Sequence, residues 1–231
     1  MNVVNDAGRY IPKYIEGYGH TIPYCNKHNE ICVVMEKTDK KFNYVKTENK
    51  ILSSIKEAIE KCNLKDGMTI SFHHHLRDGD YIINMVMKEI SEIGIKDITI
   101  VPSSLQKIHE PLIEHIKNGV VSGIHTSGMR GNLAKEISFN NILKKPVIFQ
   151  SHGGRARSIE LDQTKIDVAF IGASACDKMG NMSGRIGKSA FGSMGYAMVD
   201  AKNADKVVAL TDNLVEYPLR NPSIDQTYVD Y

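Results

Sequence analysis

Short apolar segments of strand length alternate with segments of helical periodicity along most of this 231-residue chain. Strands are predicted at residues 67–72, 98–101, 123–126, 147–150, 168–171 and 206–210, and helices at 51–59, 80–93, 105–117, 131–138 and 195–202. Each predicted strand is apolar almost throughout, which is typical of a parallel sheet covered on both faces. The sequence therefore predicts an α/β fold, in which a mainly parallel sheet has helices on both faces.

This alternating pattern starts only at Thr47, so the chain is expected to have two parts. Residues 1–46 are rich in tyrosine, lysine and asparagine and show weak periodicity, which predicts an extended N-terminal lead-in that wraps the domain. Residues 47–231 form the predicted α/β domain. Because residues 228–231 resemble the beginning of a strand, we expect this domain to be cut from a longer protein.

The composition is that of a globular protein and excludes several classes. The chain is 42% hydrophobic and 24% charged, which excludes a protein that is disordered throughout. Its 29 basic and 27 acidic residues leave a net charge of +2 without a long run of like charge, so nucleic acid is not an expected partner. No apolar run approaches the ~20 residues that a membrane span needs.

The cysteines and the N-terminus indicate the compartment. The chain has 4 cysteines without a Cys-x-x-Cys pair, and its start lacks the basic and apolar regions of a secretory signal. A reduced, cytoplasmic protein is therefore expected.

Four loops follow predicted strands, at residues 73–80, 126–131, 151–155 and 172–188. The carboxyl ends of parallel strands lie at one edge of a sheet, so we expect these loops to converge on one site. Asp80 is available as the N-cap of the helix after the first loop. The candidate binding residues of the first two loops are His73, His74, His75, Arg77, Thr126, Ser127 and Arg130.

The third loop contains Ser151 and His152, followed by Gly153, Gly154 and Arg155. Paired glycines allow backbone N–H groups to approach a carboxylate, a phosphate or a developing oxyanion closely. Arg155 could add a bidentate contact to a carboxylate. The alternative is a tight turn in which the glycines only supply positive φ angles.

Other chemical patterns are absent or incomplete. Consecutive histidines in extended backbone point to opposite faces, so at most two of His73, His74 and His75 could meet one ion, and no metal is predicted. These histidines could instead bind substrate, cap the helix or pack under the loop. A Gly-Lys-Ser at 187–189 lacks the first glycine of a P-loop, since Met182 stands there. Neither a dinucleotide fingerprint nor a Gly-x-Ser-x-Gly nucleophile elbow is present.

Taken together, motifs along nearly the whole chain resemble the alpha subunit family of citrate lyase. They are Gly8-Arg9-Tyr10-Ile11-Pro12, residues 66–75, residues 115–121, Ser151-His152-Gly153-Gly154-Arg155, residues 195–201 and residues 211–215. Residues 177–181, followed by Lys188-Ser189-Ala190, are also similar to the two-half coenzyme A transferases. The resemblance implies a coenzyme A transferase-like fold, of which this chain is the first of two similar halves.

The resemblance also implies an activity. Citrate would displace acetate from the acetyl thioester of an acyl carrier (gamma) subunit, and a beta subunit would cleave the citryl thioester to oxaloacetate. Arg77, Arg130 and Arg155 become candidates for the carboxylates of citrate, Gly153 and Gly154 for the thioester arm or its oxyanion, and Asn181 for a further substrate contact. The chain is expected to form an oligomer and to bind no permanent cofactor, since the coenzyme-A-like group arrives on the carrier.

The catalytic residue stays unknown, because related transferases take an attacking glutamate from the second half, which this chain lacks. A rival hypothesis from another class is a non-catalytic sensor, in which the same loops bind a small carboxylate or a sugar phosphate. A helix-turn-helix or a basic arm would favour the sensor, and residues 1–46 contain neither.

Overall fold

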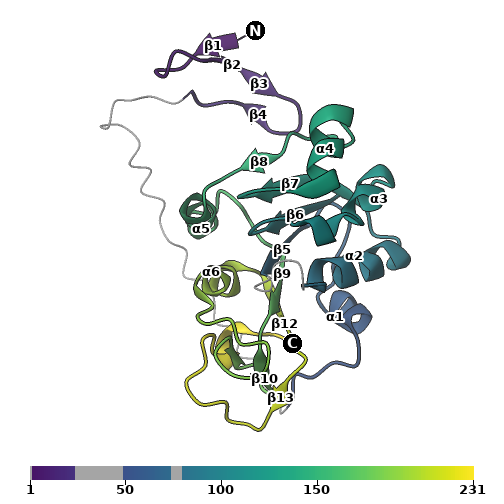
Figure 1. Ribbon diagram of the computed structural model, residues 1–231, viewed down its shortest axis with the longest axis vertical. Coiled ribbons are helices and arrows are strands. Elements are labelled where there is room, and N and C mark those ends of the chain that lie inside the picture. Colours follow the sequence, from purple (N-terminus) through teal and green to yellow (C-terminus); the bar gives the residue numbers. More distant parts are fainter. Residues whose placement is uncertain (1, 24–48, 74–79) are drawn as a thin grey trace. The chain divides into compact units, whose positions relative to one another are not determined.

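A computed structural model of the protein describes residues 2–23, 49–73 and 80–231. Contacts within the chain divide it into two compact units, Met1–Asp39 and Lys40–Tyr231, and each is described by itself. Figure 1 shows the elements of both units.

The described part of the first unit contains two short antiparallel strand pairs. Strand β1 (Asn2–Val4) pairs with β2 (Tyr10–Pro12), and β3 (Tyr14–Ile15) pairs with β4 (Gly19–His20). The side chain of Asn5 closes the first turn by accepting hydrogen bonds from the N–H groups of Ala7 and Arg9, at 3.1 and 2.9 Å. These local turns, which the weak periodicity did not predict, give the lead-in some regular structure.

In the described part of the second unit, six strands form one sheet in the order β12-β9-β5-β6-β7-β8, and every pairing is parallel. Its strands are β5 (Thr69–His73), β6 (Ile98–Pro102), β7 (Val121–Thr126), β8 (Ile148–Phe149), β9 (Val168–Gly172) and β12 (Lys206–Leu210). All six correspond to predicted strands, so the prediction of a mainly parallel sheet is confirmed.

A smaller sheet, which the sequence did not predict, lies after β9. It has the order β11-β10-β13 and consists of β10 (Ala175–Asp177), β11 (Met182–Ser183) and β13 (Leu214–Val215). Two of these strands have only two residues, too few for a periodic pattern to be visible in the sequence.

The helices are α1 (Ile55–Lys61), α2 (Ile82–Ile93), α3 (Leu112–Lys117), α4 (Gly131–Asn140), α5 (His152–Glu160) and α6 (Gly195–Asn203), with 3₁₀ turns at Lys107–His109 and Gln226–Tyr228. Gly94 ends α2 with a left-handed φ of 94°, as the glycine signal predicts. The helix predicted at 105–117 is instead divided, because Pro111 lacks an N–H group and stands at the N-cap of α3.

The prediction of a loop at 151–155 was wrong, because α5 begins at His152. The side chain of Ser151 accepts a hydrogen bond from the Gly154 N–H at 2.9 Å and so caps the helix. Serine is among the best N-cap residues, and this contact outweighs the low helix propensity of the two glycines.

Two apolar cores cover opposite faces of the six-stranded sheet (Figure 1). Ile70 and Phe72 of β5 belong to the first core, together with α1, α2, α3 and Leu133 of α4. Val101 and Ala169 belong to the second core, together with residues of α5 and α6. Since side chains alternate along each strand, these two sets point to different faces. Helices on both faces are therefore confirmed.

Candidate functional site

All four predicted loops begin at the carboxyl edge of the parallel sheet, where β5, β7, β8 and β9 end, but the segment predicted as the fourth loop, 172–188, also contains β10 and β11. Ligands of open α/β sheets bind at this edge. His74, His75 and Arg77 of the first loop lie outside the described residues, so the structure says nothing of them. The other candidates differ strongly in exposure and in the contacts that they make.

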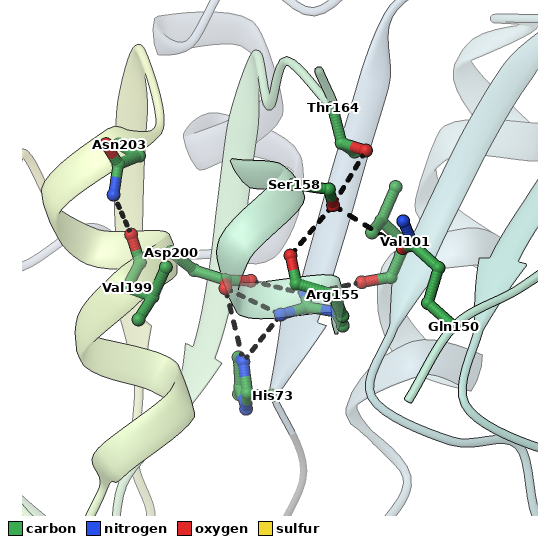
Figure 2. Close-up of polar contacts among 9 residues, drawn as sticks. All are labelled: His73, Val101, Gln150, Arg155, Ser158, Thr164, Val199, Asp200 and Asn203. Atoms are coloured by element: carbon green, nitrogen blue, oxygen red, sulfur yellow. Dashed lines mark hydrogen bonds and ion pairs between the residues drawn. The ribbon is translucent and has the colours of Figure 1, made fainter. Parts of the chain in front are cut away.

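A buried charged cluster lies at the end of β5. It consists of His73, Arg155 and Asp200 (Figure 2). Arg155 of α5 donates two hydrogen bonds to the carboxylate of Asp200 on α6, from Nη1 at 2.8 Å and from Nη2 at 2.6 Å. Nη2 also donates to the Val101 carbonyl at 2.8 Å. The exposed fractions of His73, Arg155 and Asp200 are 3%, 2% and 0%.

His73 joins the cluster through one ring nitrogen. Its Nε2 lies 3.3 Å from an Asp200 carboxylate oxygen and 3.3 Å from Arg155 Nη1. Burial by itself would raise the pKa of Asp200, but the charges and hydrogen bonds of His73 and Arg155 outweigh burial and hold this pKa well below its ordinary value. Asp200 is therefore a carboxylate over the whole physiological pH range.

This geometry argues against the predicted role of Arg155. A guanidinium that holds a buried carboxylate in a two-bond fork and is itself 2% exposed has no free edge for the carboxylate of a diffusing ligand. Arg155, in the first turn of α5, points into the protein toward α6 (Figure 2). Its partner lies 45 residues further along the chain.

The loop after β7 separates into a buried part and an exposed part. Thr126 is buried, and its hydroxyl donates to the Gly128 carbonyl at 3.1 Å. The Ser127 hydroxyl donates to the Ser103 carbonyl. These two residues fasten the turn, whereas Arg130 at the N-cap of α4 is exposed. Arg130 is thus the cation of this loop that a carboxylate can reach.

The first turn of α5 is open to solvent at the same edge. Ser151, His152 and Gly153 are exposed, and a Cβ atom placed on Gly153 would meet nothing within 4 Å. The His152 ring lies 5.4 Å from the ring of Tyr196, between centroids. The N–H groups at the start of a helix carry partial positive charge, so a carboxylate or oxyanion would be favoured here.

Asn181 is a structural residue in this arrangement. Its side-chain amide donates to the Asp177 carboxylate at 2.8 Å, and its carbonyl oxygen accepts from the Gln226 N–H at 2.9 Å. It is 5% exposed. These contacts tie the turn after β10 to the end of the chain, which argues against the predicted contact of Asn181 with substrate.

A cavity of about 690 Å³ opens beyond the ends of β9 and β12, beside the start of α2. Apolar side chains such as Leu52, Ile55 and Leu210 provide most of its lining, and Lys50 and Asp80 also reach it. None of the predicted site residues within the described ranges lines this cavity. It therefore lies apart from the exposed residues at the ends of β7 and β8.

Residues 2–23, 49–73 and 80–231 contain neither a group of three metal-ligating side chains nor a helix that is long and apolar enough to cross a membrane.

Asp200 was missed at the sequence level, although a signal for it exists. It stands between Ala197 and Ala201 at the helical spacing of a buried face, and both alanines are buried. A lone acid on the apolar face of a helix indicates a buried partner. The sequence does not reveal which cation is that partner.

The sequence matches the family described as citrate lyase, alpha subunit (CitF), over residues 48–231. Citrate lyase alpha chains of Haemophilus influenzae and Escherichia coli K12 are 52% and 49% identical over 183 residues, or 79% of this chain. A crystal structure of a Streptococcus mutans protein, named as the alpha subunit of citrate lyase and in complex with citrate, is 59% identical over 80% of this chain, with a TM-score of 0.78.

A more distant structure supports the fold alone. The thioester complex of an acyl-CoA transferase from Escherichia coli O157:H7 has a TM-score of 0.58 at 11% identity and covers 79% of this chain. The chain spans only 36% of the length of the curated relatives that it matches. Since the family match extends over most of the 231 residues, this chain belongs to the citrate lyase alpha subunit family.

Proposed function

We propose that this chain forms the first α/β half of a transferase that moves an acyl carrier thioester from acetate to citrate. The observation that carries this proposal is the 59% identity to a citrate lyase alpha subunit whose crystal structure contains citrate. The reaction exchanges one carboxylate for another on the same sulfur, so it needs carboxylate binding and oxyanion stabilisation and no net hydrolysis.

The exposed groups at the carboxyl edge suit this chemistry. Arg130 would bind a carboxylate of citrate, because it is an exposed cation in the loop that follows β7. The first N–H groups of α5 would face a second carboxylate or the oxyanion of the thioester, since the space above Gly153 is open. Arg155 has no direct substrate role in this scheme, because Asp200 occupies its guanidinium.

The remaining parts of the reaction would come from outside these 231 residues. The thioester would arrive as a coenzyme-A-like group on the gamma subunit, and the beta subunit would cleave the citryl product. The attacking glutamate would come from a second transferase half, since the curated relatives are much longer than this chain.

The test follows a labelled acetyl group. The protein is purified by affinity from its own cells, so that the subunits that it binds are retained, and is given citrate with carrier that bears a ¹³C-acetyl thioester. We expect citrate-dependent release of ¹³C-acetate, measured by NMR. Intact-mass spectrometry should then show a citryl or an unlabelled acetyl group on the carrier, according to whether the beta subunit is present.

The control reaction omits citrate and should retain the labelled acetyl carrier. Release of label that leaves a free thiol on the carrier would indicate hydrolysis and contradict transfer. Citrate binding without any release of label would instead favour the sensor hypothesis.

A matched pair of variants tests the carboxylate contact. Arg130→Ala removes one charged hydrogen-bonding group, worth roughly 1.5–3 kcal/mol, so citrate binding should weaken by about tenfold or more. Lys135→Ala removes an exposed cation from the same helix and should leave citrate binding unchanged. Calorimetry compares the two, and equal affinities would exclude Arg130 as a ligand of citrate.

A further inference from the structure

The Arg155–Asp200 pair connects four elements of the second unit. Arg155 lies in the first turn of α5, Asp200 in α6 and His73 at the end of β5, and the Val101 carbonyl belongs to β6 (Figure 2). The pair therefore links the first turn of α5, which belongs to the proposed substrate site, to the end of β5 at the same edge of the sheet.

Stability does not explain why a charged pair is used at this position. Taking both ions out of water is costly, and well-packed apolar side chains of similar size often stabilise a fold equally well or better. The surroundings are suited to such a replacement, since Ala197, Ala201 and Ile159 of the neighbouring helix turns are buried and apolar. Orientation is what the two-bond fork provides and an apolar contact does not.

The group that this fork orients is the imidazole of His73. Nε2 can either donate to Asp200 or accept from Arg155, since the guanidinium only donates, and both distances are 3.3 Å. The carboxylate and the guanidinium thus both contact Nε2 and together hold the orientation of the ring. Ser158 reinforces the arrangement, because its hydroxyl donates to the Arg155 carbonyl at 2.8 Å.

We propose that Asp200 and Arg155 are positioning residues of the transferase, which hold the imidazole of His73 and the first turn of α5 in their working positions at the carboxyl edge. The inference rests on the proposed function. It assigns the pair to the geometry of the reaction and gives neither residue a direct contact with substrate. Displacement of a reacting group by about 1 Å can lower a rate about 100-fold, so such a pair can matter without touching substrate.

The decisive variant replaces both charges at once, as Arg155→Met with Asp200→Leu. This double variant removes the fork without leaving an unpaired buried charge, so we expect it to fold with a melting temperature close to that of the unaltered protein. Its kcat for release of ¹³C-acetate should fall about 100-fold, while KM for citrate should change little, because substrate contacts are retained and alignment is lost.

The second readout is the imidazole of His73, followed by ¹⁵N NMR. In the unaltered protein, Nε2 should show a shift typical of a nitrogen in contact with charged groups, and in the double variant this shift should move, because both contacts are lost. Asp200→Asn provides a conservative variant, which keeps the side-chain shape and one acceptor oxygen, so its kcat should lie between those of the unaltered protein and the double variant.

The control is Ile90→Val in α2, a fully buried residue of the opposite face that lowers stability without touching the cluster. Its kcat should stay unchanged. A folded double variant that retains its kcat would overturn the proposal, and so would a lost rate with unchanged His73 signals. If the unaltered protein releases no label, the proposed function fails, and the NMR comparison separately decides whether the pair holds His73.

Discussion

The two faces of the six-stranded sheet differ in the side chains that fill their interiors. On the face covered by α1 to α4, large apolar side chains such as Phe72, Ile98 and Met87 are fully buried. On the face covered by α5 and α6, the second core includes alanines of β9 and α6, and the His73–Arg155–Asp200 cluster joins α5 and α6 to β5. The first face is stabilised by burial of apolar area, whereas the interior of the second face also contains an oriented charged pair.

This difference indicates where substitutions should affect stability alone and where they should affect the reaction as well. Apolar packing is non-directional and tolerates changes that conserve volume. A buried charged pair is directional, and the loss of one partner leaves the other without compensation. Five predictions test the contrast, from the largest expected effect on stability to the smallest.

Two substitutions are expected to have the largest effects, of similar size, and the first is Phe170→Ala on the face of α1 to α4. Phe170 is fully buried, and its ring stacks on that of Phe72 with 5.7 Å between centroids. Removal of the ring should lower the free energy of unfolding by about 3–5 kcal/mol, measured by urea denaturation. Phe170→Leu should recover most of this loss, and a loss below about 1 kcal/mol for the alanine variant would contradict the assignment of the main core.

On the other face, Arg155→Met alone should lower the free energy of unfolding by about 3–5 kcal/mol, because Asp200 is left as an unpaired buried charge. The double variant with Asp200→Leu should recover this loss. If the single and double variants were equally unstable, lost packing would explain the effect and charge would not.

The same pair predicts a pH dependence. The pKa of Asp200 is held below its ordinary value, near 3.9, so the unfolded chain takes up a proton before the folded chain does as the pH falls. The pair's contribution to stability is therefore present above about pH 4 and is lost progressively below it. Urea denaturation between pH 7 and pH 3 should show a shallower decline in acid for the double variant.

Two matched helix caps give a smaller effect. Ser54 caps α1 by accepting from the Glu57 N–H at 3.1 Å, and Ser151 caps α5 by accepting from the Gly154 N–H at 2.9 Å. Replacement of either serine by alanine should cost about 1 kcal/mol of stability. Only Ser151→Ala should also weaken citrate binding, and an equal effect of both variants on citrate would contradict the placement of the site at α5.

The smallest effect is expected at Lys88, which forms an exposed i,i+4 pair with Glu92 on α2 at 3.7 Å. Lys88→Ala should change the free energy of unfolding by less than about 0.5 kcal/mol, and the difference should shrink further in high salt. A larger change in thermal denaturation would show that surface charge contributes more to this helix than its geometry indicates.

The main sheet could be predicted from the sequence because local sequence patterns mark its strands. Apolar runs such as 98–101 and 168–171, and the glycine stop at Gly94, act within a few residues. The short strands β11 and β13 could not be predicted, since their pairing partners lie elsewhere in the chain and two residues carry no periodicity.

The candidate site was predicted only in outline. The ends of β5, β7 and β8 were placed correctly at one edge, but Arg155 and Asn181 were read as substrate ligands from their residue type and loop position. Each has a side-chain partner 45 residues further along the chain, Asp200 for Arg155 and Gln226 for Asn181. A charged or amide side chain near a strand end can point outward or inward, and local sequence does not distinguish these directions.

The sequence by itself determined the parallel α/β architecture, because periodicity and capping are properties of neighbouring residues. Tertiary structure alone decided which polar groups face solvent. Arg130 and Arg155 both stand at helix starts after a strand, yet one is exposed and the other is enclosed between α5, α6 and β6. The physical reason is that burying a charge is favourable only where a distant partner compensates it, and only the folded chain brings Asp200 to Arg155.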